Sequence, residues 1–540
     1  MYTRIKTSKK AKYPTMQIVH GVRTGKKVKQ KTIAHLGVIK GEKDLRRLLK
    51  LAENLISRLQ KEGLKIDQKI NIKNLKHTTT IYDGFGLVVD KLMELSGFSK
   101  VIQNIKGKHS YDLEEIIKLI IIQRLKNPSS KLRTYERQED NGFHGIKLEQ
   151  IYRSMDIIES SKEEFQKQAF QTISTFSDEP VECFFFDVTT LYFESIIQDE
   201  IRDFGFSKDQ KFNTVQIVLA LAVDFHGNPI AYETFKGNLS ETKTLIPVLE
   251  SLRKRVKIKK VTVVCDRGLA SKKNVKALQE TGFNFVIATK LRSISKKYKI
   301  NDISLYKELP QQDWMGKEYR TLYMTMDHPQ YEDTLLISTY SPSRAKKDKE
   351  DRRRFLEKLQ KKLNDSNETS IKKIINNSGY KKYTSVKKGS SITINQEAID
   401  KDASWDGFHG IAVSKQSNLT AKKALNRYQD LWVIEETFRI AKTTLKTRPI
   451  FHWMPHRIES HILLCFITLF MERFLEFLLR KKGTPLTPDK IRKALLGVHS
   501  SIFEDVKTKR SGKMESALSK DAEKIFETLK IPTERLTMLD

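Results

Sequence analysis

The sequence predicts an α/β protein in which a buried β-sheet is flanked by helices. Two apolar runs, at 183–186 and 261–265, have the unbroken hydrophobicity of strands that are covered on both faces. Segments 240–252 and 272–281 have helical patterns and follow strands along the chain. At 540 residues, the chain is long enough to contain several domains around such a core.

The order of the elements defines the predicted core more closely. After the first strand, we expect strands at 212–224 and 229–235, joined by a turn at His226-Gly227-Asn228-Pro229. The first helix, a strand ending at Asp266, the second helix and a fifth strand at 283–288 follow. Strand, strand, strand, helix, strand, helix, strand is the order of a ribonuclease-H-like fold, which we therefore predict.

The first 41 residues contain no acidic residue. Short β-like runs at 16–22 and 28–33 flank Thr24-Gly25 and predict a hairpin, followed by a helix at 44–61. A small basic β element of this kind would suit a phosphate backbone. The alternative is a basic arm without fixed structure.

Six regions are expected along the chain. The helical region before the core either binds DNA or packs on the core as a spacer. The insertion has strand patterns and a charged helix at 344–363. We interpret this helix as solvent-exposed rather than as a helix that lies along DNA. The regions are a basic N-terminal β element and helix (1–75), a helical region (76–177), the first part of the ribonuclease-H-like core (178–288), a β-rich insertion (289–417), the second part of the core (418–480) and a C-terminal helical tail (481–540).

The composition favours a nucleic-acid partner. Lysine and arginine total 99 against 66 aspartates and glutamates, a net charge of +33 that points to a polyanion rather than to a membrane surface. Three scattered cysteines fit neither a disulfide framework nor a zinc site, and they indicate a reducing, cytoplasmic location. The longest apolar run, at 462–471, is too short to span a bilayer.

Two aspartates stand where buried strands end. Asp187 and Asp266 each follow an apolar run, and a buried carboxylate costs several kcal/mol unless a metal ion or partner neutralises it. Two Mg²⁺ ions that activate phosphodiester cleavage and transfer need clustered carboxylates of this kind. The sequence contains no zinc-type His/Cys spacing and no Gly-rich phosphate loop that would favour other chemistries.

A third carboxylate lies on a predicted helix that runs without Gly or Pro from Tyr428 to beyond Lys442. At about 100° per residue, Tyr428, Glu435, Arg439 and Lys442 fall on one stripe with Trp432 at its edge. Glu436 points about 100° further round. The alternative is a surface helix with ordinary ion pairs, but apolar neighbours leave little of this helix polar.

The spacing of Tyr428, Glu435 and Lys442 resembles the Tyr–Arg–Glu–Lys signature of insertion-sequence DDE transposases. In that family the Glu is the third metal-binding carboxylate of a ribonuclease-H-like core. The family's Arg falls on Leu431 here, which leaves Arg427 and Arg439 as candidates to take its place.

The resemblance implies a DNA transposase that cleaves and transfers insertion-sequence ends. It implies that Asp187, Asp266 and Glu435 are catalytic and hold two Mg²⁺ ions, for which Mn²⁺ can substitute. DNA contacts are expected from a phenol, an indole and two cations: Tyr428, Trp432, Arg439 and Lys442. The expected partners are double-stranded element ends and target DNA, with no membrane and with a possible homodimer on DNA, at the nucleoid of a prokaryotic cytoplasm. The alternatives are a metal-dependent nuclease without strand transfer and a catalytically inactive DNA-binding protein.

Overall fold

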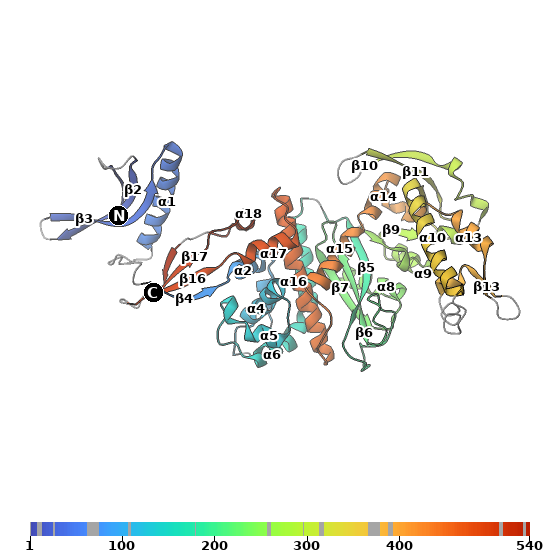
Figure 1. Cartoon of the computed structure of the whole chain (residues 1–540), viewed down its shortest axis with the longest axis horizontal. Coiled ribbons are helices and arrows are strands. Elements are labelled where there is room, and N and C mark those ends of the chain that lie inside the picture. Colours follow the sequence, from blue (N-terminus) through green and yellow to red (C-terminus); the bar gives the residue numbers. More distant parts are fainter. Residues whose placement is uncertain are drawn as a thin grey trace. The chain divides into compact units, whose positions relative to one another are not determined.

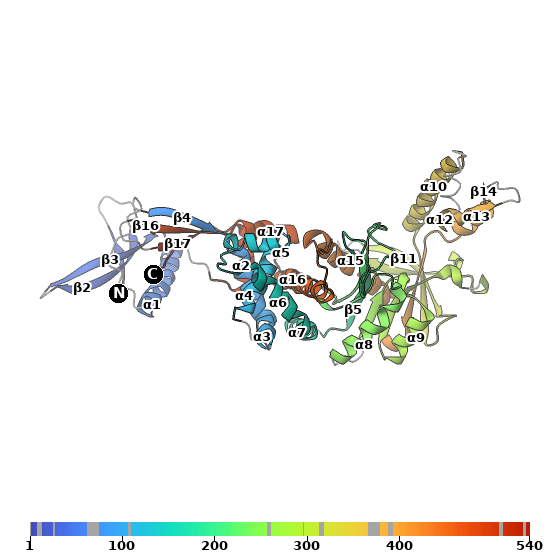
Figure 2. The ribbon, with the colours of Figure 1, turned by 90° about the horizontal axis from the view of Figure 1, so that it is seen from below.

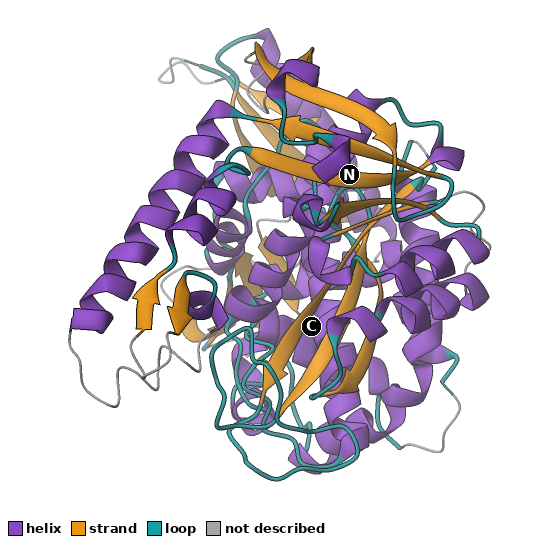
Figure 3. Ribbon diagram, turned by 90° about the vertical axis from the view of Figure 1, so that its right-hand side faces the viewer, coloured by secondary structure: helices purple, strands orange, loops and turns teal. Residues whose placement is uncertain are grey.

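The computed structural model describes the chain at 2–7, 13–24, 27–61, 75–105, 110–178, 180–255, 261–294, 296–312, 318–364, 378–386, 392–506, 511–532 and 536–539. It forms two compact units, one of residues 1–77 with 503–511 and 540, and the other of 78–502 with 512–539. Helices and strands are mixed along the chain (Figure 1 and Figure 3). The six predicted regions divide the chain more finely than these units, and their boundaries stay predictions.

The first unit contains the predicted hairpin. Strands β1 (Tyr2–Lys6), β2 (Thr15–Thr24) and β3 (Lys27–Val38) form an antiparallel sheet in that order. Helix α1 (Glu42–Lys61) buries apolar side chains against it, with a core of Met16, Ile18, Leu48 and Ala52. The turn at Gly25 lies outside the described residues.

A separate four-stranded sheet has the order β18-β17-β16-β4. Its strands are β4 (Leu75–Ile81), β16 (Ser500–Asp505), β17 (Ser511–Glu515) and β18 (Leu536–Leu539). The tail contains the helices α17 (Pro488–Leu496) and α18 (Lys520–Leu529), but the prediction of a purely helical tail is wrong. Pairing between β4 and β16 joins segments far apart in sequence, which local patterns do not reveal.

Helices precede the core sheet along the chain. Asp112 caps α4 by accepting the Glu115 N–H at 3.1 Å. The helices are α2 (Gly84–Ser96), α3 (Phe98–Gln103), α4 (Leu113–Lys126), α5 (Lys131–Glu136), α6 (Leu148–Ile158) and α7 (Lys162–Phe176). Several of them pack against α16 (Pro455–Lys481), so this region shares one apolar core with the second half of the chain.

The central sheet has the predicted ribonuclease-H-like arrangement. Strands β5 (Cys183–Tyr192), β6 (Gln216–Val223) and β7 (Pro229–Lys236) form an antiparallel meander. On the other side of β5, β8 (Thr262–Cys265) and β9 (Asn284–Thr289) pair in parallel. Helices α8 (Leu245–Arg255) and α9 (Lys272–Glu280) make the crossovers to these two strands.

The β-rich insertion extends this same sheet to nine strands, in the order β10-β11-β12-β15-β9-β8-β5-β6-β7. Its paired strands are β10 (Lys307–Gln312), β11 (Glu318–Asp327), β12 (Thr334–Tyr340) and β15 (Phe408–Ser414), and β15 joins β9. The remaining elements are α10 (Pro342–Asn364), α12 (Ser378–Lys381), β13 (Thr384–Val386), β14 (Ile392–Ile394) and α13 (Gln396–Ala403).

Alternating side chains of β5 enter two different layers. Phe184 and Phe186 join a cluster with apolar residues of α8 and α9. Phe185 joins the larger cluster with α15 (Trp432–Arg439) and α16. The sheet is therefore covered by α8 and α9 on one face and by α15 and α16 on the other (Figure 2). This double cover explains the unbroken apolar run of β5.

Helix α16 is almost entirely buried, including three of its charged side chains, Glu472, Arg473 and Glu476. Burial foremost, and the charge of Glu476 next, raise the pKa of Glu472 to about 8, against the opposing charges of Arg492 and Arg473. Among the helices of the described residues, none is long and apolar enough to cross a membrane.

Replacing Glu472 with Gln should stabilise the protein at pH 8 and leave it nearly unchanged at pH 5. The folded-state pKa lies above the ordinary 4.5, so the folded protein binds the extra proton and loses stability as pH rises from 4.5 to 8. We expect a gain on the order of 4 kcal/mol at pH 8. Thermal unfolding at both pH values measures it, with exposed Glu164→Gln as control. An equal shift at both pH values would contradict a raised pKa.

Candidate active site

Two carboxylates lie side by side at the ends of neighbouring parallel strands. Phe186 of β5 is in register with Cys265 of β8, so the next residues, Asp187 and Asp266, are adjacent across the strands. The Val188 N–H donates to Asp187 Oδ1 at 2.7 Å. Burial raises the pKa of Asp187 to about 6, and the negative charges of Asp266 and Glu241 add to this, although Lys208 opposes it.

Glu241 is a further carboxylate beside this pair. Asp266 caps the short helix Arg267–Leu269 by accepting the Gly268 N–H. A Cβ at Gly268 would lie 2.9 Å from Glu241 Oε2 and 3.0 Å from Asp266 Oδ1. Both carboxylates therefore lie close to this backbone position, and the site concentrates negative charge.

A lysine reaches into this negative charge. The ammonium of Lys208 lies 2.9 Å from Glu241 Oε1 and 3.8 Å from Asp187 Oδ1, and it donates to the Val188 carbonyl oxygen. Its side chain remains one-third exposed. Lys208 therefore links the carboxylate of β5 to the carboxylate that follows β7.

The prediction of one uninterrupted helix through Tyr428 and Lys442 is wrong. Helix α14 (Ala421–Gln429) ends before Asp430, α15 begins at Trp432, and a π-helical turn (Ile440–Thr444) follows. The N–H groups of Leu431, Val433 and Ile434 each donate to the carbonyl oxygen of the residue three positions before them. This tightened 3₁₀-like turn buries Leu431 and changes the angular spacing between Tyr428 and Glu435.

The residues of the predicted stripe therefore lie on separate elements, with Tyr428 on α14, Glu435 and Arg439 on α15 and Lys442 in the π-helical turn. Tyr428 packs its ring on His409, with 5.0 Å between centroids, and burial together with the charge of Asp266 raises its pKa to about 12. Glu435 lies exposed in the first turn of α15, and Trp432 is 56% exposed.

The other predicted site residues face different partners. Lys442 lies 3.4 Å from Asp209, and burial lowers its pKa. Arg439 pairs with Glu436 at 3.4 Å. Glu436 also reaches buried Arg473 at 3.5 Å, so it faces α16.

Comparison with known proteins identifies the family. Residues 182–471, more than half of the chain, match the family model described as the transposase DDE domain. The chain belongs to the DDE transposases. Residues 3–67 of the transposase match a second model, the N-terminal domain of IS1634 family transposases. The fold, the transposase activity and the insertion-sequence type predicted from the sequence are thus confirmed.

Solved transposase structures match the chain at low sequence identity. The transposase is 10% identical to a piggyBac transposase synaptic complex with hairpin DNA, with TM-score 0.38, covering 77% of this chain and 80% of that one. It is 10% identical to a Mos1 transposase paired-end complex, with TM-score 0.15, covering 44% of this chain and 66% of that one. No curated protein matches the sequence.

Membership of this family makes the protein a metal-dependent enzyme that cleaves and transfers DNA strands in transposition. Within the described ranges, no group of three or more His, Cys, Asp or Glu side chains is arranged to hold a metal ion. Asp187 and Asp266 are together, whereas Glu435 does not complete such a group with them. The donor chemistry nevertheless fits a hard divalent cation, because carboxylates are concentrated around the two aspartates.

Sequence reasoning did not place Glu241, Lys208 and Asp209 in the candidate site. Glu241 ends the stretch Gly237-Asn238-Leu239-Ser240-Glu241, which lies between β7 and α8. Lys208 and Asp209 lie in a loop without periodicity. Arg448, which donates two hydrogen bonds to Asp209 at 2.7 and 2.8 Å, lies beyond the helix that the pattern covered.

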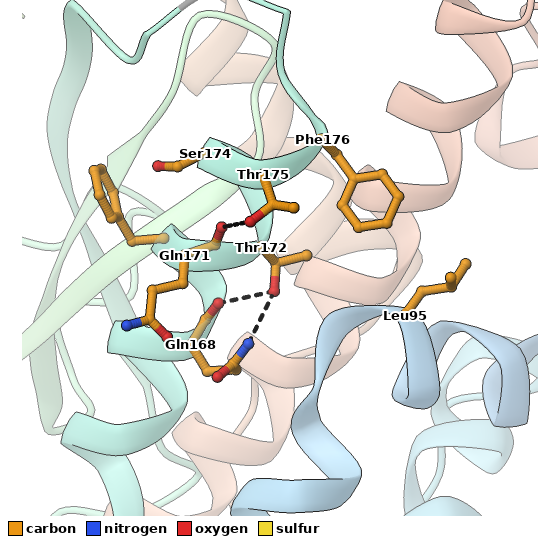
Figure 4. Close-up of a pocket in the computed structure, with 8 residues that line it drawn as sticks. Leu95, Gln168, Gln171, Thr172, Ser174, Thr175 and Phe176 are labelled. Carbon is orange, nitrogen blue, oxygen red and sulfur yellow. Dashed lines mark hydrogen bonds between the residues drawn. The ribbon is translucent and has the colours of Figure 1, made fainter.

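A separate pocket of about 490 Å³ lies along α7 beside the end of α2 (Figure 4). Its lining is Leu95, Gln168, Phe170, Gln171, Thr172, Ser174, Thr175 and Phe176. Thr172 and Gln168 both donate to the Ser96 carbonyl oxygen. With no titratable group in this lining, the pocket offers no acid–base or metal chemistry.

Proposed function

We propose that Asp187, Asp266 and Glu435 form the catalytic triad and hold two Mg²⁺ ions, for which Mn²⁺ can substitute. The observation that carries the proposal is the adjacency of Asp187 and Asp266 on β5 and β8, with the pKa of Asp187 raised. Such a concentration of negative charge favours a bound cation. Glu435 is exposed in α15, a helix that contacts β5, and would complete the set. The metal ions would supply activation of the attacking oxygen and stabilisation of the leaving one.

The substrate in this proposal is double-stranded DNA at the insertion-sequence ends, followed by target DNA. Lys442 and Tyr428 would contact a phosphate near the scissile bond, and Trp432 and Arg439 are exposed for further DNA contacts. The enzyme would act on nucleoid DNA in a prokaryotic cytoplasm, as a homodimer assembled on the DNA. The net charge of +33 supports binding to a polyanion.

Binding of Mn²⁺ in solution tests the metal assignment. Replacing Asp187 with Asn should weaken Mn²⁺ binding by at least about tenfold, because a neutral amide is a poor ligand for a hard cation. Electron paramagnetic resonance of free Mn²⁺ measures this without DNA. Glu194→Gln removes an exposed carboxylate from the loop after β5 and should bind like the wild type. Equal affinity in the Asp187 variant and the wild type would refute the assignment.

A further inference from the structure

The loop between β5 and β6 places two consecutive residues of opposite charge in opposite halves of the candidate site. Lys208 lies beside the carboxylates of Glu241 and Asp187. Asp209 lies beside the cations Lys442 and Arg448. The two halves are neighbours, because Lys208 and Asp209 are consecutive in the chain.

The Lys208 half has the charge pattern of an occupied cation site. One ammonium lies between Glu241 and Asp187, whose own surroundings are otherwise negative. Because an ammonium carries one charge where a divalent ion carries two, it would neutralise these carboxylates only partly. A divalent cation bound at Asp187 would compete with this ammonium.

The Asp209 half has the pattern of an occupied anion site. Arg448 donates Nε and Nη2 to the two carboxylate oxygens of Asp209, and Lys442 lies 3.4 Å from both. Although burial alone would raise it, these partners hold the pKa of Asp209 below its ordinary value. A bidentate guanidinium with an ammonium beside it is the arrangement that also binds phosphate.

The loop fixes both side chains by hydrogen bonds of its backbone. The Lys208 N–H donates to Thr190 Oγ1 on β5 at 3.1 Å. Buried Ser207 accepts the N–H groups of Asp209 and Lys211 at 3.3 and 3.1 Å. The position of the dipeptide is thus set by β5 itself, the strand that carries Asp187.

We propose that Lys208 and Asp209 are positioning residues that occupy the places of a divalent cation and a DNA phosphate and withdraw when these bind. The proposal rests on the metal and DNA assignments above. In the free enzyme, Lys208 would keep Asp187 and Glu241 together, and Asp209 would keep Lys442 and Arg448 together. Each would therefore compete with the ligand whose charge it mimics.

Mn²⁺ affinity tests the Lys208 half. Lys208→Met should bind Mn²⁺ about tenfold more tightly than the wild type, since it removes a competing charge. Lys211→Met removes an equal charge from the same loop, where Lys211 lies over the Tyr192 ring, and should change affinity far less. A purely structural role predicts weaker binding instead, so unchanged or weaker binding in Lys208→Met overturns the proposal.

DNA affinity without metal tests the Asp209 half. Asp209→Asn should bind a short fluorescein-labelled duplex several-fold more tightly by anisotropy, because Lys442 and Arg448 become available to phosphate. Glu200→Gln removes an exposed charge from the same loop and controls for net charge. Equal gains in both variants would overturn this half of the proposal.

The wild type provides a test that does not depend on folding of a variant. Saturating Mg²⁺ should increase modification of Lys208 by an amine-reactive ester, read by mass spectrometry, while Lys211 stays constant. Unchanged or reduced modification of Lys208 would contradict its withdrawal. If the wild type binds Mn²⁺ but Lys208→Met gains nothing, the positioning role alone fails. If the wild type binds no Mn²⁺, the metal assignment fails first.

Discussion

Replacing Glu435 with Gln should lower metal-dependent cleavage of element-end DNA by at least about a thousandfold, since a lost metal ligand removes several kcal/mol of transition-state stabilisation. DNA binding should remain near that of the wild type, because the substitution keeps the size of an exposed side chain. Nicking and strand transfer on a duplex with the element end measure the first effect, and a gel shift measures the second.

Glu436→Gln is the matched control on the neighbouring position. Its carboxylate faces Arg473 of α16 at 3.5 Å, so its loss should cost a little stability and keep most of the cleavage. If Glu435→Gln cuts as fast as the wild type, the third ligand lies elsewhere, and Glu241, beside Asp266, is the next residue to replace. A wild type that binds DNA but never cuts it with Mg²⁺ or Mn²⁺ would favour the inactive alternative.

The sequence predicts the part of the site that belongs to regular, buried elements. Asp187 and Asp266 could be found because each follows an unbroken apolar run, and parallel pairing then places them together. The turn at Asp430 and Leu431 could not be found, because no Gly or Pro marks it and only the burial of Leu431 in the folded protein accounts for it.

Loop residues and long-range pairings escape local patterns for a different reason. The partners of Lys208 and Asp209 lie on β5, on the turn after β7 and beyond α15. No periodicity of the sequence connects these segments with the loop that carries Lys208 and Asp209. Likewise, the strands of the insertion were predicted individually, but their addition to the core sheet through β15 and β9 depends on tertiary pairing.

The sequence alone does not show which residue takes the place of the signature Arg. Leu431 is buried in the turn, so it cannot contact DNA as an arginine would. Of the two candidates to replace it, Arg427 lies over the Phe225 ring at 4.7 Å, and Arg439 pairs with Glu436 while remaining 62% exposed. Arg439 therefore has the freer guanidinium for a phosphate.

Replacing Arg473 with Met should destabilise the protein by about 3–5 kcal/mol, because it leaves a buried carboxylate unpaired. Arg473 is 2% exposed and lies 2.6 Å from Glu476, which is 4% exposed. It also donates to the backbone oxygens of Gly227 and His226 at 3.2 and 3.1 Å, tying α16 to the turn between β6 and β7. Thermal and urea unfolding measure the loss.

Two further variants separate this charge effect from loss of packing. Glu436 pairs with both Arg473 and Arg439. Arg439→Met removes the exposed one of these two partners and should lower the stability by less than about 1 kcal/mol. Combining Arg473→Met with Glu476→Gln removes the unpaired buried charge and should recover part of the stability. If Arg473→Met loses no more stability than Arg439→Met, the buried ion pair does not hold α16 against the β6–β7 turn. The same conclusion follows if the double variant is no more stable than Arg473→Met alone.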